Sequence, residues 1–233
     1  APVTLKVLKD AYPTQEEIVR FGNEYELTKD LTVPGIRKAF EALVIDHKPA
    51  LILEYIEGDT LKNTCIKQPR SLAECLTVAI SVTQALHGLH AHNLIHKDLN
   101  SNNILISAGP LRATIIDFGI AARFEPQVQQ PKVSNGFEGT LSYIAPEQTG
   151  RMNVPVDQRA DLYSLGVTLY ELFTGQPPFQ ADDTAELIHC HLAKTPAPLP
   201  QVNPEIPEIL SHIVLKLLEK NPENRYQSAF GVK

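Results

Sequence analysis

The chain has 233 residues, of which 43% are hydrophobic and 21% are charged, and this composition excludes a disordered protein and a collagen. Its 27 acidic and 21 basic residues give a net charge of -6. The charges are spread along the chain without basic blocks, so we expect no nucleic-acid partner. No apolar run approaches the ~18 residues that cross a bilayer, so we expect no membrane partner either.

The three cysteines, Cys65, Cys75 and Cys190, form no CxxC pair. This pattern favours neither a disulfide framework nor a zinc site and is typical of buried thiols in a reducing compartment. We therefore expect a cytoplasmic protein. Met152 is the only methionine, and the chain opens with the strand-like run Pro2–Lys6. We expect from this opening a piece of a longer protein, whose other domains are its partners.

The first sixty residues predict a small α+β unit, because short apolar strands alternate there with one polar helix. The turn Asp46–Pro49 separates the last two strands. The strands are expected at Pro2–Lys6, Ala39–Ile45 and Ala50–Ile56, and the helix at Thr14–Asp30.

From Ser71 the pattern changes to longer helices. Ser71 and Glu74 have the spacing of a capping box, which predicts a helix from there to Asn93. Two short apolar runs follow, Ile104–Ile106 and Thr114–Ile116, and they predict a hairpin.

The remaining chain predicts one buried helix and several irregular segments. Leu162–Phe173 is apolar nearly all round, which is typical of a helix inside a domain. Phe124–Phe137 is polar and too long for a tight turn, so it predicts a loop. Pro196–Pro207 predicts an extended connector, and Asn221 followed by Pro222 predicts the start of a helix.

Two motifs carry recognisable chemistry. The first is His-Lys-Asp-Leu-Asn-Ser-Asn-Asn at residues 96–103, and the second is Asp-Phe-Gly at residues 117–119. They place the Asp98 carboxylate on a loop, the Asn103 carboxamide five residues further on, and the Asp117 carboxylate on a turn next to glycine. Such oxygen ligands suit Mg²⁺, which takes one or two carboxylates together with waters and substrate phosphates.

These motifs resemble the catalytic loop and the metal-binding turn of protein kinases, and further matches follow in the same order. Residues 139–147, Gly-Thr-Leu-Ser-Tyr-Ile-Ala-Pro-Glu, are similar to the end of an activation segment. Asp161–Gly166 is similar to the start of the central buried helix, and Arg225 lies where the family pairs an arginine with Glu147. The chain is identified as a member of the protein-kinase family.

The resemblance extends to the beginning of the chain. Lys6 is similar to the strand lysine that holds the nucleotide phosphates, and Glu24 to the helix glutamate that pairs with it. Leu53–Ile56 resembles the hinge whose backbone binds adenine, which makes Glu54 and Ile56 candidate nucleotide-binding residues. The amino-acid sequence around residues 138–153 resembles that of the kinase module of large multi-domain bacterial signalling proteins.

The resemblance implies a two-lobed α+β kinase fold in one domain. Residues 1–57 would form a partial small N-lobe, and residues 58–233 a mainly helical C-lobe. The family's glycine-rich loop and its two strands are missing from the sequence, so we expect the chain as given to have little or no activity.

The implied reaction is transfer of the γ-phosphoryl group of ATP, with Mg²⁺, to a Ser or Thr hydroxyl of a protein substrate. Under this interpretation Asp98 accepts the hydroxyl proton, and Asn100 and Thr140 are further catalytic residues beside Asp98. Asn103 and Asp117 hold Mg²⁺.

Two departures from the family pattern leave an alternative open: Lys97 replaces an arginine, and Asn100 stands where Ser/Thr kinases usually have a lysine. A further departure is Thr28, which replaces a large apolar residue on the first helix and predicts looser packing against the metal-binding turn. The alternative is a pseudokinase, a nucleotide-binding or scaffold module of a signalling protein. The intact proton acceptor and metal ligands favour the enzyme. A small-molecule phosphotransferase is disfavoured because residues 145–147 read Ala-Pro-Glu.

Overall fold

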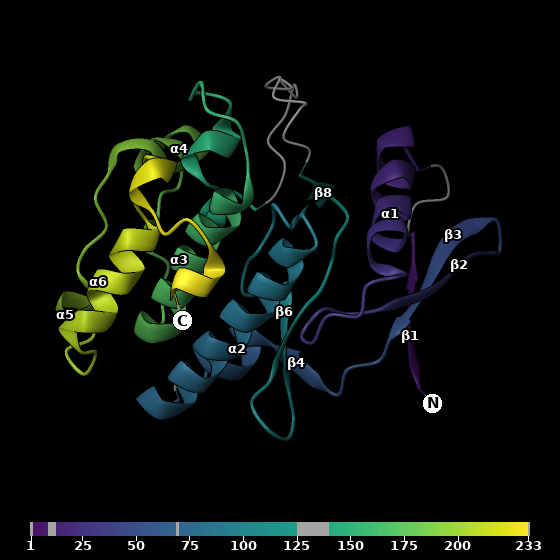
Figure 1. Cartoon of the computed structure of the whole chain (residues 1–233), viewed down its shortest axis with the longest axis horizontal. Coiled ribbons are helices and arrows are strands. Elements are labelled where there is room, and N and C mark those ends of the chain that lie inside the picture. Colours follow the sequence, from purple (N-terminus) through teal and green to yellow (C-terminus); the bar gives the residue numbers. More distant parts are fainter. Residues whose placement is uncertain (1, 9–12, 69, 125–139, 233) are drawn as a thin grey trace.

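The structure is a computed structural model that describes residues 2–8, 13–68, 70–124 and 140–232. A small sheet with one helix lies at one end of the molecule, and a mainly helical part forms the other end (Figure 1). The predicted α+β architecture is confirmed. The predicted loop Phe124–Phe137 lies, apart from Phe124, outside the described residues.

The small sheet is antiparallel, with the strand order β1-β3-β2. β1 spans Val3–Val7, β2 spans Ala39–Ile45 and β3 spans Lys48–Glu54. β3 begins and ends two residues earlier than predicted, because only Asp46 and His47 form the hairpin turn. Their φ angles of 48° and 64° suit the two-residue turns that match the twist of a hairpin.

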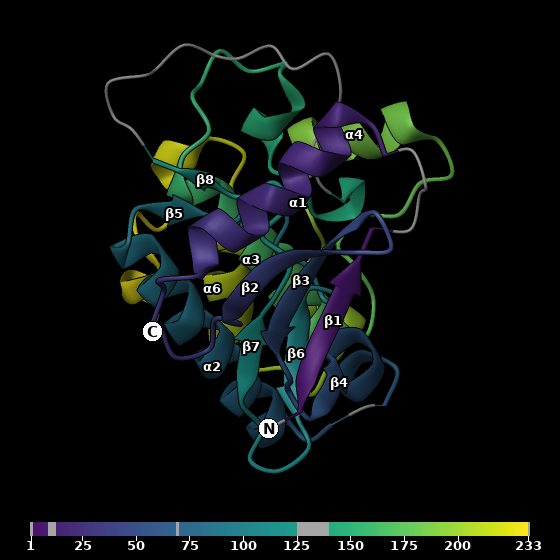
Figure 2. The ribbon, with the colours of Figure 1, turned by 90° about the vertical axis from the view of Figure 1, so that its right-hand side faces the viewer.

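Helix α1 spans Gln15–Thr28 and begins at the capping box of Thr14 and Glu17. It packs on one face of the small sheet, where Phe21 joins a cluster of buried side chains from β2 and β3 (Figure 2). The same contact fixes the position of Glu24, because that side chain lies three residues, about one helical turn, beyond Phe21.

The other part of the molecule contains two further small sheets. β4 (Gly58–Thr60), β6 (Ile104–Ser107) and β7 (Ala113–Ile115) form one, and β5 (Leu94–Ile95) and β8 (Ala122–Arg123) form the other. The predicted hairpin of β6 and β7 is confirmed. β4 was not predicted; it approaches β6 so closely that a Cβ atom at Gly58 would collide with the carbonyl of Ile106.

Two long helices form the centre of this part. α2 spans Leu72–Ala91 and begins at the predicted capping box of Ser71 and Glu74. α3 spans Gln158–Thr174 and ends at Gly175, whose φ of 79° requires the left-handed region that glycine tolerates.

The C-terminal third differs from the sequence prediction in two places. Helices α4 (Thr184–Ala193) and α6 (Glu208–Leu217) flank a connector that is not extended throughout, since Leu199–Val202 forms the short helix α5. Proline is tolerated in a first helical turn, where no backbone donor is lost. Asn221 does cap the residues after it, but they form only the 3₁₀ turn Pro222–Asn224.

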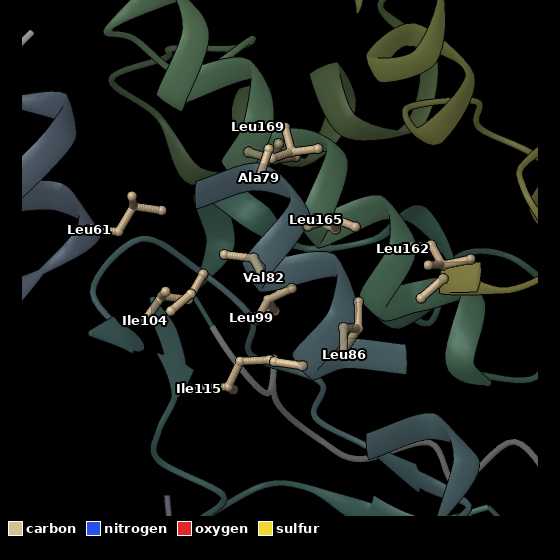
Figure 3. Packing of buried hydrophobic residues seen from close by; sticks show 14 of the residues in the cluster. Leu61, Ala79, Val82, Leu86, Leu99, Ile104, Ile115, Leu162, Leu165 and Leu169 are labelled. Atoms are coloured by element: carbon tan, nitrogen blue, oxygen red, sulfur yellow. The ribbon is translucent and has the colours of Figure 1, made fainter. Parts of the chain in front are cut away.

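The hydrophobic core lies between α2, α3 and the β6–β7 hairpin (Figure 3). By length and composition alone, α2 is apolar enough to cross a membrane. However, Val82, Leu86 and Leu89 have no exposed surface and belong to this core. Since a buried core helix passes the same test, this finding is weak support for a membrane span.

Candidate active site

The loop after β5 is held by one buried carboxylate. Asp161, near the start of α3, is fully buried, and its two oxygens accept the backbone N–H groups of His96 and Lys97, each at 2.8 Å. Burial by itself would raise the pKa of Asp161. The hydrogen bond from His90 and those from the loop outweigh burial and hold this pKa below its usual value.

This anchoring supports a strained backbone. Lys97 has a φ of 66°, which is uncommon for a residue with a side chain. The His96 ring packs edge-on against Phe118, with ring centroids 4.9 Å apart. The loop and the turn at residues 117–119 therefore form one packed unit.

Asp98 lies at the centre of a set of neutral donors. Its Oδ1 accepts the backbone N–H of Thr140 at 2.7 Å, and its Oδ2 accepts the amide of Asn103 at 2.9 Å. The amide nitrogen of Asn100 lies 3.1 Å from Asp98 Oδ1 and 3.2 Å from the hydroxyl of Thr140. The structure thus brings Asp98 together with three other predicted site residues, and their contacts orient its carboxylate.

Asn100 is also bonded within its own loop. Its side-chain oxygen accepts the backbone N–H groups of Asn102 at 2.9 Å and of Asn103 at 3.2 Å. Only 1% of Asn100 is exposed. It therefore stabilises the turn that carries Asp98 and adds no positive charge beside it.

A second group forms around Lys6. Its Nζ lies 2.6 Å from Glu24 Oε2 and 3.1 Å from Asp117 Oδ1. Burial would lower the pKa of Lys6, but the two carboxylates outweigh it and raise this pKa. Burial would raise the pKa of Asp117, and the Lys6 ammonium outweighs it and keeps this pKa low. The predicted pairing of Lys6 with Glu24 is present in the structure.

Asp117 itself has a φ of 65°, and the turn that follows it is tied to α1. The amide of Asn23 donates to the carbonyls of Gly119 at 3.3 Å and Ala121 at 2.7 Å. Thr28, which was predicted to pack more loosely, is buried, and its hydroxyl donates to the backbone carbonyl of Glu24 at 2.6 Å. α1 and the Asp117 turn are therefore coupled.

The two groups meet at one cavity of about 410 Å³, whose lining includes Lys6, Asp98, Asp117 and Thr140. A larger hollow of about 540 Å³ lies beside it, between α1 and residues 119–121, but its lining holds none of these four side chains. The smaller cavity is therefore the candidate site, since a reaction site is defined by its converging functional groups.

Three of the predicted nucleotide-binding residues, Glu24, Glu54 and Ile56, lie outside the lining of this cavity, as far as the described residues define it. The predicted metal ligand Asn103 is also outside this lining and reaches the site through its bond to Asp98. Glu54 accepts the backbone N–H of Lys38 at 3.3 Å. Ile56 is half-buried in the segment between β3 and β4. The resemblance assigns the contribution of Glu54 and Ile56 to their backbone groups.

The residues fit the expected metal by their chemistry. The side chain of Asp117 is 46% exposed, and Asn103 uses its amide nitrogen on Asp98, so its oxygen remains as the acceptor. One carboxylate and one carboxamide suit Mg²⁺, which keeps several waters and also binds substrate phosphates.

The segment after Thr140 is fixed by buried polar contacts. The hydroxyl of Tyr143 donates to Glu171 at 2.5 Å and lies 2.8 Å from the hydroxyl of Ser101. Glu147 binds Arg225 through both carboxylate oxygens, at 2.6 and 2.8 Å. The predicted pairing of Glu147 with Arg225 is therefore present.

Sequence reasoning did not assign site roles to three residues that the geometry singles out: Asn23, Arg37 and Asp161. A charged residue at the start of an apolar helix was a usable signal for Asp161. Arg37 lies with its Nη2 3.7 Å from Glu24 Oε1. Its approach depends on how the chain turns after α1, so no local pattern pointed to it.

Comparison with known proteins agrees with this geometry. The protein kinase domain family matches residues 1–230. A probable serine/threonine-protein kinase of Clostridium perfringens is 35% identical over 231 residues, covering 97% of this chain and 33% of that protein. Serine/threonine-protein kinase PknB of Mycobacterium tuberculosis is 33% identical over 233 residues, covering 97% of this chain and 37% of that protein.

A third relative is of a different kind. Hybrid signal transduction histidine kinase G of Dictyostelium discoideum is 55% identical over 103 residues, which cover 44% of this chain and 3% of that protein. The chain spans about a third of the length of the two bacterial relatives above.

The chain belongs to the protein kinase family. It has the α+β kinase fold, and it is a kinase domain homologous to bacterial serine/threonine kinases. The family in general uses ATP and Mg²⁺ and acts on protein substrates.

Proposed function

We propose that this chain is a serine/threonine protein kinase domain that transfers the γ-phosphoryl group of ATP to Ser or Thr of a protein substrate in signal transduction. The observation that carries the proposal is the shared cavity, on which Asp98 lies together with Lys6 and Asp117. The names of the bacterial relatives support Ser/Thr over Tyr.

The residues divide between the two substrates. Asp98, oriented by Asn100, Asn103 and Thr140, accepts the proton of the attacking hydroxyl. Its donors are neutral N–H groups, which leave the carboxylate charge available for that proton.

On the nucleotide side, Lys6 supplies a cation and Asp117 a carboxylate to the lining of the cavity. Asn103 and Asp117 would hold Mg²⁺, Lys6 would hold phosphate oxygens, and the backbone of residues 54–56 would take the adenine. Bound MgATP would supply the phosphoryl group and the metal charge that offsets the charge building up during transfer. Glu24 orients Lys6 through the 2.6 Å contact.

We also propose the setting of this domain. Its bacterial relatives are about three times as long, and one relative is a hybrid histidine kinase, which supports a longer signalling protein whose other domains are partners. The free buried cysteines support a cytoplasmic location. We propose residues 1–57 and 58–233 as the two lobes, since β4 begins at Gly58 and pairs with β6 of the helical part.

The alternative is a pseudokinase, which Asn100 favours because it brings a neutral amide where the resemblance implies a cation. The experiment that separates the two uses the full-length protein with radiolabelled ATP, a mixture of generic protein substrates and phosphoamino-acid analysis. The kinase proposal expects phosphoserine or phosphothreonine that is lost in Asp98→Asn. ATP binding without any labelled product would establish the pseudokinase.

A further inference from the structure

The carboxylate of Glu24 faces two cations. One oxygen lies 2.6 Å from Lys6 Nζ, and the other lies 3.7 Å from Arg37 Nη2. The side chain of Glu24 is 2% exposed and that of Arg37 is 11% exposed. This second ion pair is therefore shielded from water, and its charges interact more strongly than a pair on the surface does.

Arg37 approaches Glu24 from a different element than Lys6. Its backbone N–H donates to the carbonyl of Ile115 at 3.1 Å, and the neighbouring Ile36 forms a bridge to the same residue. Ile115 ends β7, two residues before Asp117. The guanidinium thus links α1 to the strand that leads into the metal-binding turn.

The guanidinium remains protonated at neutral pH. Burial lowers the pKa of Arg37, but the nearby carboxylates of Glu24, Asp117 and Glu54 oppose the shift. An arginine starts from a pKa far above neutral, so it keeps its charge. Arg37 is therefore a fixed cation beside Glu24.

Lys6, unlike Arg37, is not a permanent counter-ion of Glu24, because its ammonium is shared between Glu24 and Asp117. Any shift of its ammonium toward phosphate oxygens would weaken its contact with Glu24. Leaving a buried carboxylate without its only cation is strongly unfavourable. With Lys6 alone, binding the phosphates would therefore favour movement of Glu24, and of α1, toward water.

We propose that Arg37 is a positioning residue, a permanent second counter-ion of Glu24 that holds α1 against the Asp117 turn and frees Lys6 to bind phosphate. The proposal deepens the proposed function and rests on it for the phosphate step. The holding of α1 is independent of nucleotide and can be measured without it.

The test uses the full-length protein with Arg37→Met, the charge-conserving Arg37→Lys, and the matched control Lys38→Met, which removes a cation from the next residue. Hydrogen exchange of α1 is measured without nucleotide. The KM for MgATP and kcat are measured on a protein substrate. Circular dichroism checks that each variant folds.

We expect Arg37→Met to speed the exchange of α1 and to raise the KM for MgATP by about ten-fold, which corresponds to about 1.4 kcal/mol, with a smaller change in kcat. Arg37→Lys should recover most of both effects, and Lys38→Met should match the wild type. Unchanged exchange and KM in Arg37→Met, or equal changes in Lys38→Met, would overturn the proposal.

A role in stability alone would lower the melting temperature of Arg37→Met without changing its KM, and this outcome also overturns the proposal. If the wild-type protein labels no Ser or Thr, the proposed function fails. The exchange of α1 and the directly measured affinity for MgATP then decide by themselves whether Arg37 acts as proposed.

Discussion

The pair of Glu147 and Arg225 allows a quantitative prediction about stability. The side chains of Arg225 and Glu147 are 0% and 1% exposed. Besides its two bonds to Glu147, the guanidinium donates to the backbone carbonyls of Glu219 at 2.7 Å, Arg159 at 2.9 Å and Lys220 at 3.1 Å. Arg225→Met therefore leaves a buried charge and three buried carbonyls without this donor.

Removing one partner of such a buried pair costs about 3–5 kcal/mol. For a chain of this size each kcal/mol lowers the melting temperature by about 2–4 °C, so the expected loss is about 6–20 °C. Differential scanning calorimetry measures it, with circular dichroism to confirm that the variant folds at low temperature.

Two further variants make this prediction specific. Arg20→Met removes an arginine whose pair with Glu16 is on the surface, with side chains 41% and 72% exposed, and it should cost less than about 1 kcal/mol. Adding Glu147→Met to Arg225→Met should recover part of the loss, because it removes the unpaired charge. A loss from Arg225→Met as small as that from Arg20→Met would refute the reasoning.

Three other positions give further predictions. Burial first, and the Lys220 cation second, lower the pKa of His191 to about 4; the unfolded chain then binds more protons as pH falls from about 6.5 to about 4, and stability is lost in that window. His191→Gln should reduce by about 2 kcal/mol the difference in urea-measured stability between pH 7 and pH 4.5. Burial lowers the pKa of Lys220 to about 8, so at pH 8 acetic anhydride should modify it faster than exposed lysines, as read by mass spectrometry of peptides. Gly58→Ala should destabilise the chain by about 1–3 kcal/mol in urea unfolding, because its methyl group meets the carbonyl of Ile106.

Elements with strong local signals were predictable from the sequence. The capping box at Ser71 and Glu74 begins α2 as predicted, and the β2 strand has the predicted bounds. These features depend on residues three apart or on alternation along one strand. The residues of the catalytic loop could be proposed because their order along the chain is itself the motif.

Features that depend on contacts between distant parts of the chain were not predictable from the sequence. β4 forms because Gly58 admits close contact with β6, and that contact joins residues more than forty positions apart. The connector rich in proline contains α5, since proline restricts φ without excluding the first turn of a helix. Arg37 reaches Glu24 only because the chain after α1 returns beside β7.

The central claim is that one cavity holds a proton acceptor and a metal ligand with different tasks. It is tested most directly by measuring MgATP affinity and maximal turnover together in the full-length Asp98→Asn and Asp117→Asn variants, with the exposed Asp182→Asn as the control. We expect Asp98→Asn to keep MgATP affinity within about two-fold and to lose turnover by about 10²–10⁴-fold. Asp117→Asn should lose both properties, and Asp182→Asn neither. Equal loss of affinity in the two site variants, or wild-type turnover in Asp98→Asn, would contradict the account.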